Sequence, residues 1–79
     1  MKEIMVGAPL RAGDRVIVPL IKEAGFSGMG GVYYAARPVA LIIAEEECML
    51  FFSLDSDVPL SDEIIHDAAG QARAVLEED

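Results

Sequence analysis

The chain contains one cysteine, one histidine and no tryptophan among its 79 residues. Because Cys48 is alone, no disulfide can form within the chain, and so low a thiol count is typical of a reducing compartment. Cys48 and His66 together also fall short of the ligand set that a structural zinc site needs. We therefore expect no metal, no cofactor and no covalent cross-link to stabilise the fold.

Positive charge is also scarce. Six Lys and Arg against fourteen Asp and Glu give a net charge of −8, and the cations are dispersed rather than clustered. Nucleic acids and anionic membranes both require a basic patch, so we expect neither as a partner. We interpret the acidic surplus as a solubilising surface, with salt adaptation or a basic partner as the alternatives.

Long hydrophobic runs are absent as well. The longest apolar stretch, Pro38 to Ala44, is far shorter than the roughly 20 residues that span a bilayer. Residues 1–10 lack the apolar centre of a signal peptide, and Glu3 balances the charge of Lys2. These patterns predict a cytoplasmic protein without membrane insertion.

What the chain has in plenty is apolar residues, at 53% of the total. Area scaling gives roughly 115 kcal/mol from apolar burial, against about 120 kcal/mol for ordering the chain. An isolated monomer would therefore be marginally stable. With no disulfide or metal at hand, self-association is the stabilising device that remains, and we expect a homodimer or a higher homo-oligomer.

The residue patterns predict a single α+β domain over residues 1–79, with strands at about 4–54 and a helix at about 61–77. We expect a small antiparallel sheet of three to four strands. Pro19 should lie at an edge or a bulge, and Pro38 should break or bulge its strand. The predicted strands are residues 15–21, 32–44 and 48–54, and residues 4–10 are predicted as an edge strand or an irregular entry. The predicted connections are a turn at 11–14, a glycine-rich loop at 24–31 and a polar reversal at 45–47.

The C-terminal helix has the clearest signals. Ser61 is a good N-cap, and Asp62 and Glu63 place negative charge in the first turn. Leu60 and Ile65 occupy the positions of a hydrophobic staple. One apolar stripe follows at helical spacing, and it consists of Ile64, Ile65, Ala68, Ala72, Val75 and Leu76.

The central hairpin has more apolar surface than one helix can cover. Residues 39–44 and 49–52 are apolar at successive positions, so both faces of the hairpin require burial. A lone domain would leave a large apolar patch in water. We therefore expect a second subunit to cover it.

Few residues suggest chemistry. The glycines at 24–31 lead into a strand, whereas a phosphate-binding loop leads into a helix. Cys48 follows three glutamates that should raise its pKa, and we interpret it as a partly buried apolar residue. His66 lies on the polar side of the helix beside Glu63. Glu45, Glu46 and Glu47 alternate across a turn and should not converge. We expect no catalytic residue.

Arg37 is the most isolated charge within an apolar region. It could bind a carboxylate of a ligand or of another subunit, or extend into solvent. Aromatic residues at strand spacing are more typical of a core or a subunit interface, and they are Phe26, Tyr33, Tyr34, Phe51 and Phe52. The candidate ligand or interface residues are Arg37, Gly28, Gly30, Gly31 and Tyr34.

Several short motifs carry a family resemblance. They are Val6-Gly7-Ala8-Pro9-Leu10, Gly13-Asp14-Arg15-Val16-Ile17-Val18-Pro19-Leu20, Gly30-Gly31-Val32 and Arg37-Pro38-Val39-Ala40-Leu41. In this order they resemble the GerW (YtfJ-type) sporulation protein family over about residues 6–76, in a version with a shorter glycine-rich segment. The resemblance implies an association with spore formation and germination, and it implies no catalytic residues.

Together these observations favour a non-enzymatic, self-associating accessory or structural protein of the GerW-like type. The alternative is a small-molecule or anion-binding module, with a site at a subunit interface near the glycine-rich segment and Arg37. An enzyme using His66 or Cys48 is the third and least favoured hypothesis. The identity of any other protein partner stays open.

Overall fold

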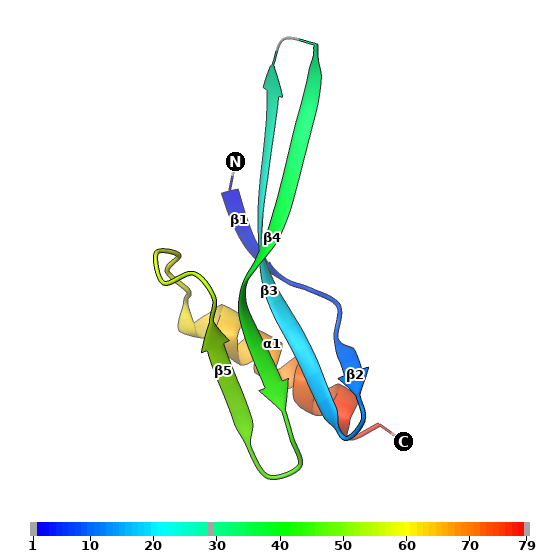
Figure 1. Cartoon of the computed structure of the whole chain (residues 1–79). Helices are drawn as coiled ribbons and strands as arrows, with labels where there is room; N and C mark the ends of the chain where they lie inside the picture. The colour runs from blue at the N-terminus through cyan, green and yellow to red at the C-terminus, as the bar shows by residue number, and fades with distance from the viewer. Residues whose placement is uncertain (1, 29, 79) are drawn as a thin grey trace.

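The computed structural model describes the backbone of residues 2–28 and 30–78, and the side chains of residues 4–23, 30 and 35–78. Strands come first along the chain and one helix ends it (Figure 1). The elements are β1 (Lys2–Val6), β2 (Leu10–Ala12), β3 (Arg15–Gly28), β4 (Gly31–Ala44), β5 (Met49–Ser53) and α1 (Asp62–Leu76).

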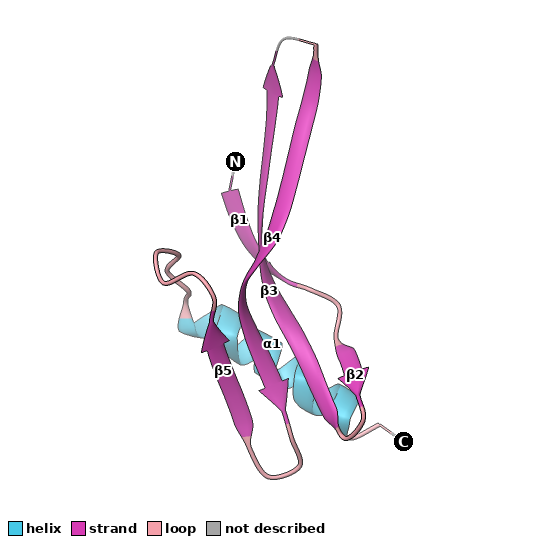
Figure 2. Ribbon diagram, in the orientation of Figure 1, coloured by secondary structure: helices cyan, strands magenta, loops and turns pink. Residues whose placement is uncertain are grey.

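The strands form one antiparallel sheet in the order β1-β3-β4-β5, with β2 also paired to β3 (Figure 2). The predicted α+β class with a C-terminal helix is confirmed. The main order has the four strands of the prediction, and β2 is a fifth, because the segment predicted at 4–10 is interrupted at residues 7–9 and pairs again from Leu10. The turn predicted at 11–14 is only two residues long. Gly13 has a φ of +65°, which suits glycine, and lets Ala12 pair with Arg15.

Pro19 was predicted at an edge or a bulge; it does not lie on an edge strand, and the register shift follows one residue later, between Leu20 and Ile21. β3 lies inside the sheet, but Pro19 occupies the gap where the chain crosses from β1 to β2. Its carbonyl oxygen accepts a hydrogen bond from the Gly7 N–H at 2.8 Å. Since N–H and C=O of one strand residue point the same way, the missing donor of Pro19 faces this irregular crossing and breaks no regular ladder.

The glycine-rich segment is not the loop predicted for residues 24–31. Strand pairing continues to Gly28 opposite Gly31, so that β3 and β4 form a long arm beyond the sheet (Figure 1). The register places Gly25 opposite Tyr34 and Phe26 opposite Tyr33. The sequence interpretation had weighed the weak strand preference of glycine alone, without the strong strand preference of the aromatic residues across the pair.

The break predicted at Pro38 is a β-bulge. The register passes from Leu20 opposite Ala40 to Ile21 opposite Pro38, which leaves Val39 as the additional residue. The carbonyl oxygen of Val39 accepts hydrogen bonds from the backbone N–H groups of Leu54 at 2.8 Å and Asp55 at 3.2 Å. The bulge thus ties the end of β5 to the middle of β4.

The helix begins as predicted. Ser61 is the N-cap, and its Oγ accepts a hydrogen bond from the Ile64 N–H at 3.2 Å. At the other end, Arg11 donates from Nη1 to the Val75 carbonyl oxygen at 2.8 Å, where a cation suits the helix dipole. Both ends of α1 are therefore fixed by side chains.

The core lies between α1 and one face of the sheet. Ala68 and Ala72 of the predicted stripe are fully buried, and the other stripe residues pack around them. The helix contacts β1, β3 and β4. The buried sheet residues on this side are Val16, Val18, Leu20, Val39, Ala40, Ile42 and Ala44.

Gly7 provides a test of this packing. A Cβ at residue 7 would lie 2.8 Å from both Ile21 Cδ1 and Pro19 Cγ, and 3.2 Å from the Pro19 carbonyl oxygen. We expect Gly7→Ala to lower the free energy of unfolding by about 1–3 kcal/mol through overpacking. The measurement is urea denaturation followed by circular dichroism.

Gly70→Ala is the matched control, because a Cβ at Gly70 meets no atom within 4 Å. Gly70 lies inside α1, so alanine there should raise the free energy of unfolding by about 0.5–1 kcal/mol. Equal changes in the free energy of unfolding for the two substitutions would show that the close contacts at Gly7 do not affect stability.

Candidate functional site

The sheet face turned away from α1 is apolar. Alternation along the paired strands assigns to this face the residues between the buried core positions. In Figure 1 the helix passes behind the sheet, so the uncovered face is turned towards the viewer. We call this surface the open face; its residues are Met5, Leu10, Ile17, Pro19, Ile21, Leu41, Ile43, Leu50 and Phe52.

The open face follows cross-strand rows. Leu10, Ile17, Ile43 and Leu50 form one such row across four strands. Ile17 and Ile43 are half-buried by their neighbours, whereas Leu10 is 61% exposed and Leu50 is 38% exposed. Such a continuous apolar surface is typical of an interaction site and unusual on a monomer.

The chain exposes more surface than its mass requires. Its accessible area is 5490 Å², whereas scaling for a compact monomer of this size gives about 4,700 Å². The radius of gyration is 14.4 Å, against roughly 12 Å for a compact chain of this length. The excess area of roughly 800 Å², to which the projecting β3–β4 arm contributes together with the open face, is of the size that one partner buries in a standard protein–protein interface.

Arg37 has a partner within its own chain, which the sequence interpretation left open. Its Nη1 lies 2.8 Å from Asp55 Oδ2. The hydrogen bond from Arg37, followed by one from the Asp57 backbone N–H, holds the pKa of Asp55 below its usual range. The carboxylate beside Arg37 thus comes from the segment after β5 of the same chain, and not from the ligand or second subunit that the sequence interpretation offered.

The other candidate residues do not join Arg37. Gly28, Gly30 and Gly31 lie at the tip of the β3–β4 arm, where Gly30 has a φ of +96°. From Gly31 to Arg37 the strand advances roughly 20 Å. A site that combined both would therefore require a second copy.

The aromatic residues predicted to lie in a core or an interface divide into two groups. The side chains of Phe26, Tyr33 and Tyr34 lie outside the described residues. Phe51 and Phe52 are 45% and 47% exposed, and the alternation of β5 turns them to opposite faces of the sheet. They are not core residues of the single chain, which leaves the interface interpretation as a prediction.

A shallow hollow of about 250 Å³ lies on the open face beside Arg37. Its lining is almost wholly apolar, because the side chains of Pro19, Ile21, Ala36 and Pro38 surround it. Arg37 is the one polar side chain among the described residues that line the hollow. The hollow can therefore hold an apolar group, but it has too few polar groups to orient a polar ligand.

Cys48 is exposed rather than partly buried as predicted, because it lies in the reversal between β4 and β5. Its Sγ donates to Glu45 Oε1 at 3.0 Å. This hydrogen bond, together with the nearby glutamate charge, raises the pKa of the Cys48 thiol. The thiolate is therefore suppressed, which is the reverse of what a nucleophile needs.

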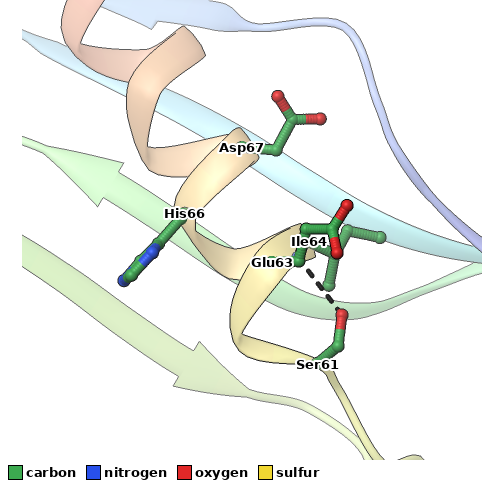
Figure 3. Close-up of a pocket in the computed structure, with 5 residues that line it drawn as sticks. All are labelled: Ser61, Glu63, Ile64, His66 and Asp67. Atoms are coloured by element: carbon green, nitrogen blue, oxygen red, sulfur yellow. Dashed lines mark hydrogen bonds between the residues drawn. The ribbon is translucent and has the colours of Figure 1, made fainter.

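His66 lines an open hollow at the start of α1 with Ser61, Glu63, Ile64 and Asp67. Figure 3 shows the side chains of His66 and Asp67 pointing in different directions from the helix. The dashed line in Figure 3 is the N-cap hydrogen bond, so Ser61 already has a structural role. This group does not converge on a common point.

Comparison of the chain with protein-family models, curated proteins and solved structures gives no match. Within residues 2–28 and 30–78, no group of three or more His, Cys, Asp and Glu side chains is placed to hold a metal ion. The same part of the chain has no helix of the length and apolar content needed to cross a membrane. The open face is thus the surface feature that most requires an explanation.

The Arg37–Asp55 pair predicts a pH dependence. Because the pKa of Asp55 is lower in the folded than in the unfolded chain, the pair contributes stability above about pH 4 that is lost as the pH falls further. We expect Asp55→Asn to be less stable than the parent at pH 7, with the difference shrinking towards pH 3. The measurement is the urea midpoint across this range.

Asp57→Asn is the control, since Asp57 interacts with Asp55 through its backbone N–H, which the substitution retains. A difference between Asp55→Asn and the parent that stays constant from pH 7 to pH 3 would contradict the assignment.

Proposed function

We propose that this chain is a non-enzymatic, self-associating accessory or structural protein, and that a second copy of the chain covers its open face. The observation that carries the proposal is the continuous apolar surface on the side of the sheet opposite α1. Burial of such a surface is the dominant favourable term in association.

The surface area supports a second copy as the occupant. The excess of roughly 800 Å² over a compact monomer is about one partner's share of a standard interface. The open face is also self-compatible, because branched aliphatic and aromatic side chains from two such faces interdigitate when sheets pack. Arg15 precedes Ile17 at the start of β3, and Glu45 follows Ile43 directly after β4. The two side chains form an ion pair at 2.6 Å, so their charges neutralise each other beside the open face.

The resemblance to the GerW family fits this proposal and stays a prediction. Gly7 and Gly13, two of the glycines that carry the resemblance, have structural roles in the crossing and the turn. The exposed thiol of Cys48 fits a reducing compartment, so we place the protein in the cytoplasm.

The alternative of an anion-binding module is weaker. Arg37 is the cation that such a site would use, and Asp55 already neutralises it at 2.8 Å. The apolar hollow beside Arg37 favours a hydrophobic group instead, and a side chain from a second copy is such a group.

A charge at the centre of the open face tests the proposal. Ile43 lies between Ile17 and Leu50 in one cross-strand row. We expect Ile43→Lys to weaken self-association at least about tenfold, because burial of an unpaired ammonium group is unfavourable. The measurement is light scattering after size-exclusion chromatography across a concentration series.

Ala74→Lys is the matched control, because Ala74 lies exposed on α1. It introduces the same charge and should leave association unchanged. Circular dichroism and thermal melting establish that both variants fold. A parent chain that is a stable, well-folded monomer at low micromolar concentration would overturn the proposed function.

A further inference from the structure

The outer edge of β5 has backbone N–H and C=O groups that do not face β4. The hydrogen bonds at the two ends of the β4–β5 pair show which residues carry them. The Glu45 N–H donates to the Cys48 carbonyl oxygen at 2.9 Å, and the Leu54 N–H donates to the Val39 carbonyl oxygen at 2.8 Å. Since bonding alternates along an antiparallel pair, every second residue between Cys48 and Leu54 faces β4. The residues whose N–H and C=O groups face outward are Met49, Phe51 and Ser53.

This edge has none of the devices that keep edge strands apart. β5 ends the strand order, and its sequence from Met49 to Ser53 contains no proline and no charged residue. The helix packs mainly against β1, β3 and β4, and Met49 is the residue of β5 that packs against the core. Phe51 consequently stays 45% exposed even though it lies on the helix side of the sheet.

Exposed apolar side chains also concentrate here. Among the described residues, four of the six large hydrophobic side chains that are exposed belong to β5 or to the residue after it. They lie on both faces of the strand, so packing on the open face alone would leave Phe51 in water. The four are Leu50, Phe51, Phe52 and Leu54.

We propose that β5 pairs with β5 of a second copy, antiparallel and about a two-fold axis through Phe51. The inference rests on the proposed self-association, and it adds an edge contact that is separate from the packing over the open face. With this register each outward-facing residue of the edge gains a partner. Phe51 meets the partner's Phe51, and Met49 meets the partner's Ser53.

The remaining cross-strand pairs are complementary as well. Leu50 lies opposite the partner's Phe52 on the open face. Cys48 lies opposite the partner's Leu54. Each pair joins two apolar side chains at the short separations where cross-strand contacts stabilise a sheet. The pairing therefore uses all four exposed hydrophobic side chains of this edge.

The symmetry determines the shape of the assembly. An antiparallel pair related by a two-fold axis extends the sheet and keeps both helices on the same side. The two Phe51 side chains then lie side by side between the two helices. The two open faces become one continuous surface, which the face-to-face contact of the proposed function then covers.

One feature of this register is unfavourable. Glu47 lies opposite the partner's Asp55, and each chain carries a net charge of −8. Because salt screens like charges, raising NaCl from about 0.05 M to about 0.5 M should tighten the dimer. Glu47→Lys should reduce this salt dependence.

The decisive variant is Ser53→Pro. The Ser53 N–H points outward, so proline removes an edge donor and leaves the hydrogen bonds to β4 intact, as edge strands allow. We expect the dimer to weaken at least about tenfold, as measured by light scattering and sedimentation equilibrium. Ser53→Ala removes the same side-chain oxygen, retains the N–H and should dimerise like the parent.

The outcomes separate this inference from the proposed function. If Ser53→Pro dimerises like the parent while Ile43→Lys is monomeric, the edge contact is overturned and packing through the open face stands. If circular dichroism shows that Ser53→Pro is unfolded, Phe51→Lys takes its place, because lysine at an edge opposes pairing. A parent chain that is a stable, well-folded monomer at low micromolar concentration overturns both.

Discussion

The packing of Ala68 and Ala72 against the sheet is the contact on which the rest of the structure depends. Both side chains are fully buried, and their small size lets the helix axis approach the strands closely. The sheet residues beneath them are the core, so this single layer accounts for the fully buried side chains on the described part of the chain. Ser61 and Arg11 then fix the two ends of the helix.

One helix covers only part of the sheet. It packs mainly over β1, β3 and β4, and it leaves the opposite face and the side chains of Leu50, Phe51 and Phe52 on β5 exposed. Since the chain places apolar residues at consecutive positions on β4 and β5, the same sequence that builds the core also builds a second apolar surface. The apolar residues on one side of these strands thus form the core, and those on the other side form the surface proposed for association.

Much of the fold could be predicted from the sequence, because its signals are local. The helix, its Ser61 cap and the reversal after Ala44 follow from composition and spacing over a few residues. The pairing of Gly25 with Tyr34 could not be predicted in this way, because partner strands decide whether glycine stays in a ladder. The open face could also be predicted from local signals, because the strands are apolar at successive positions and therefore on both sides. The Arg37–Asp55 pair could not be predicted, since it depends on the position of a bulge in the folded chain.

That bulge decides more than the local twist of β4. Side chains alternate between the two faces of a strand, so the additional residue Val39 reverses the assignment for everything before it. Arg37 is thereby carried to the helix side, within reach of Asp55, and Pro38 is carried to the opposite side, beside Ile21. If Val39 were paired in regular register instead of bulged, Arg37 would stand in the apolar surface and Pro38 would face the helix. The bulge therefore keeps the charge of Arg37 off the open face of this small sheet.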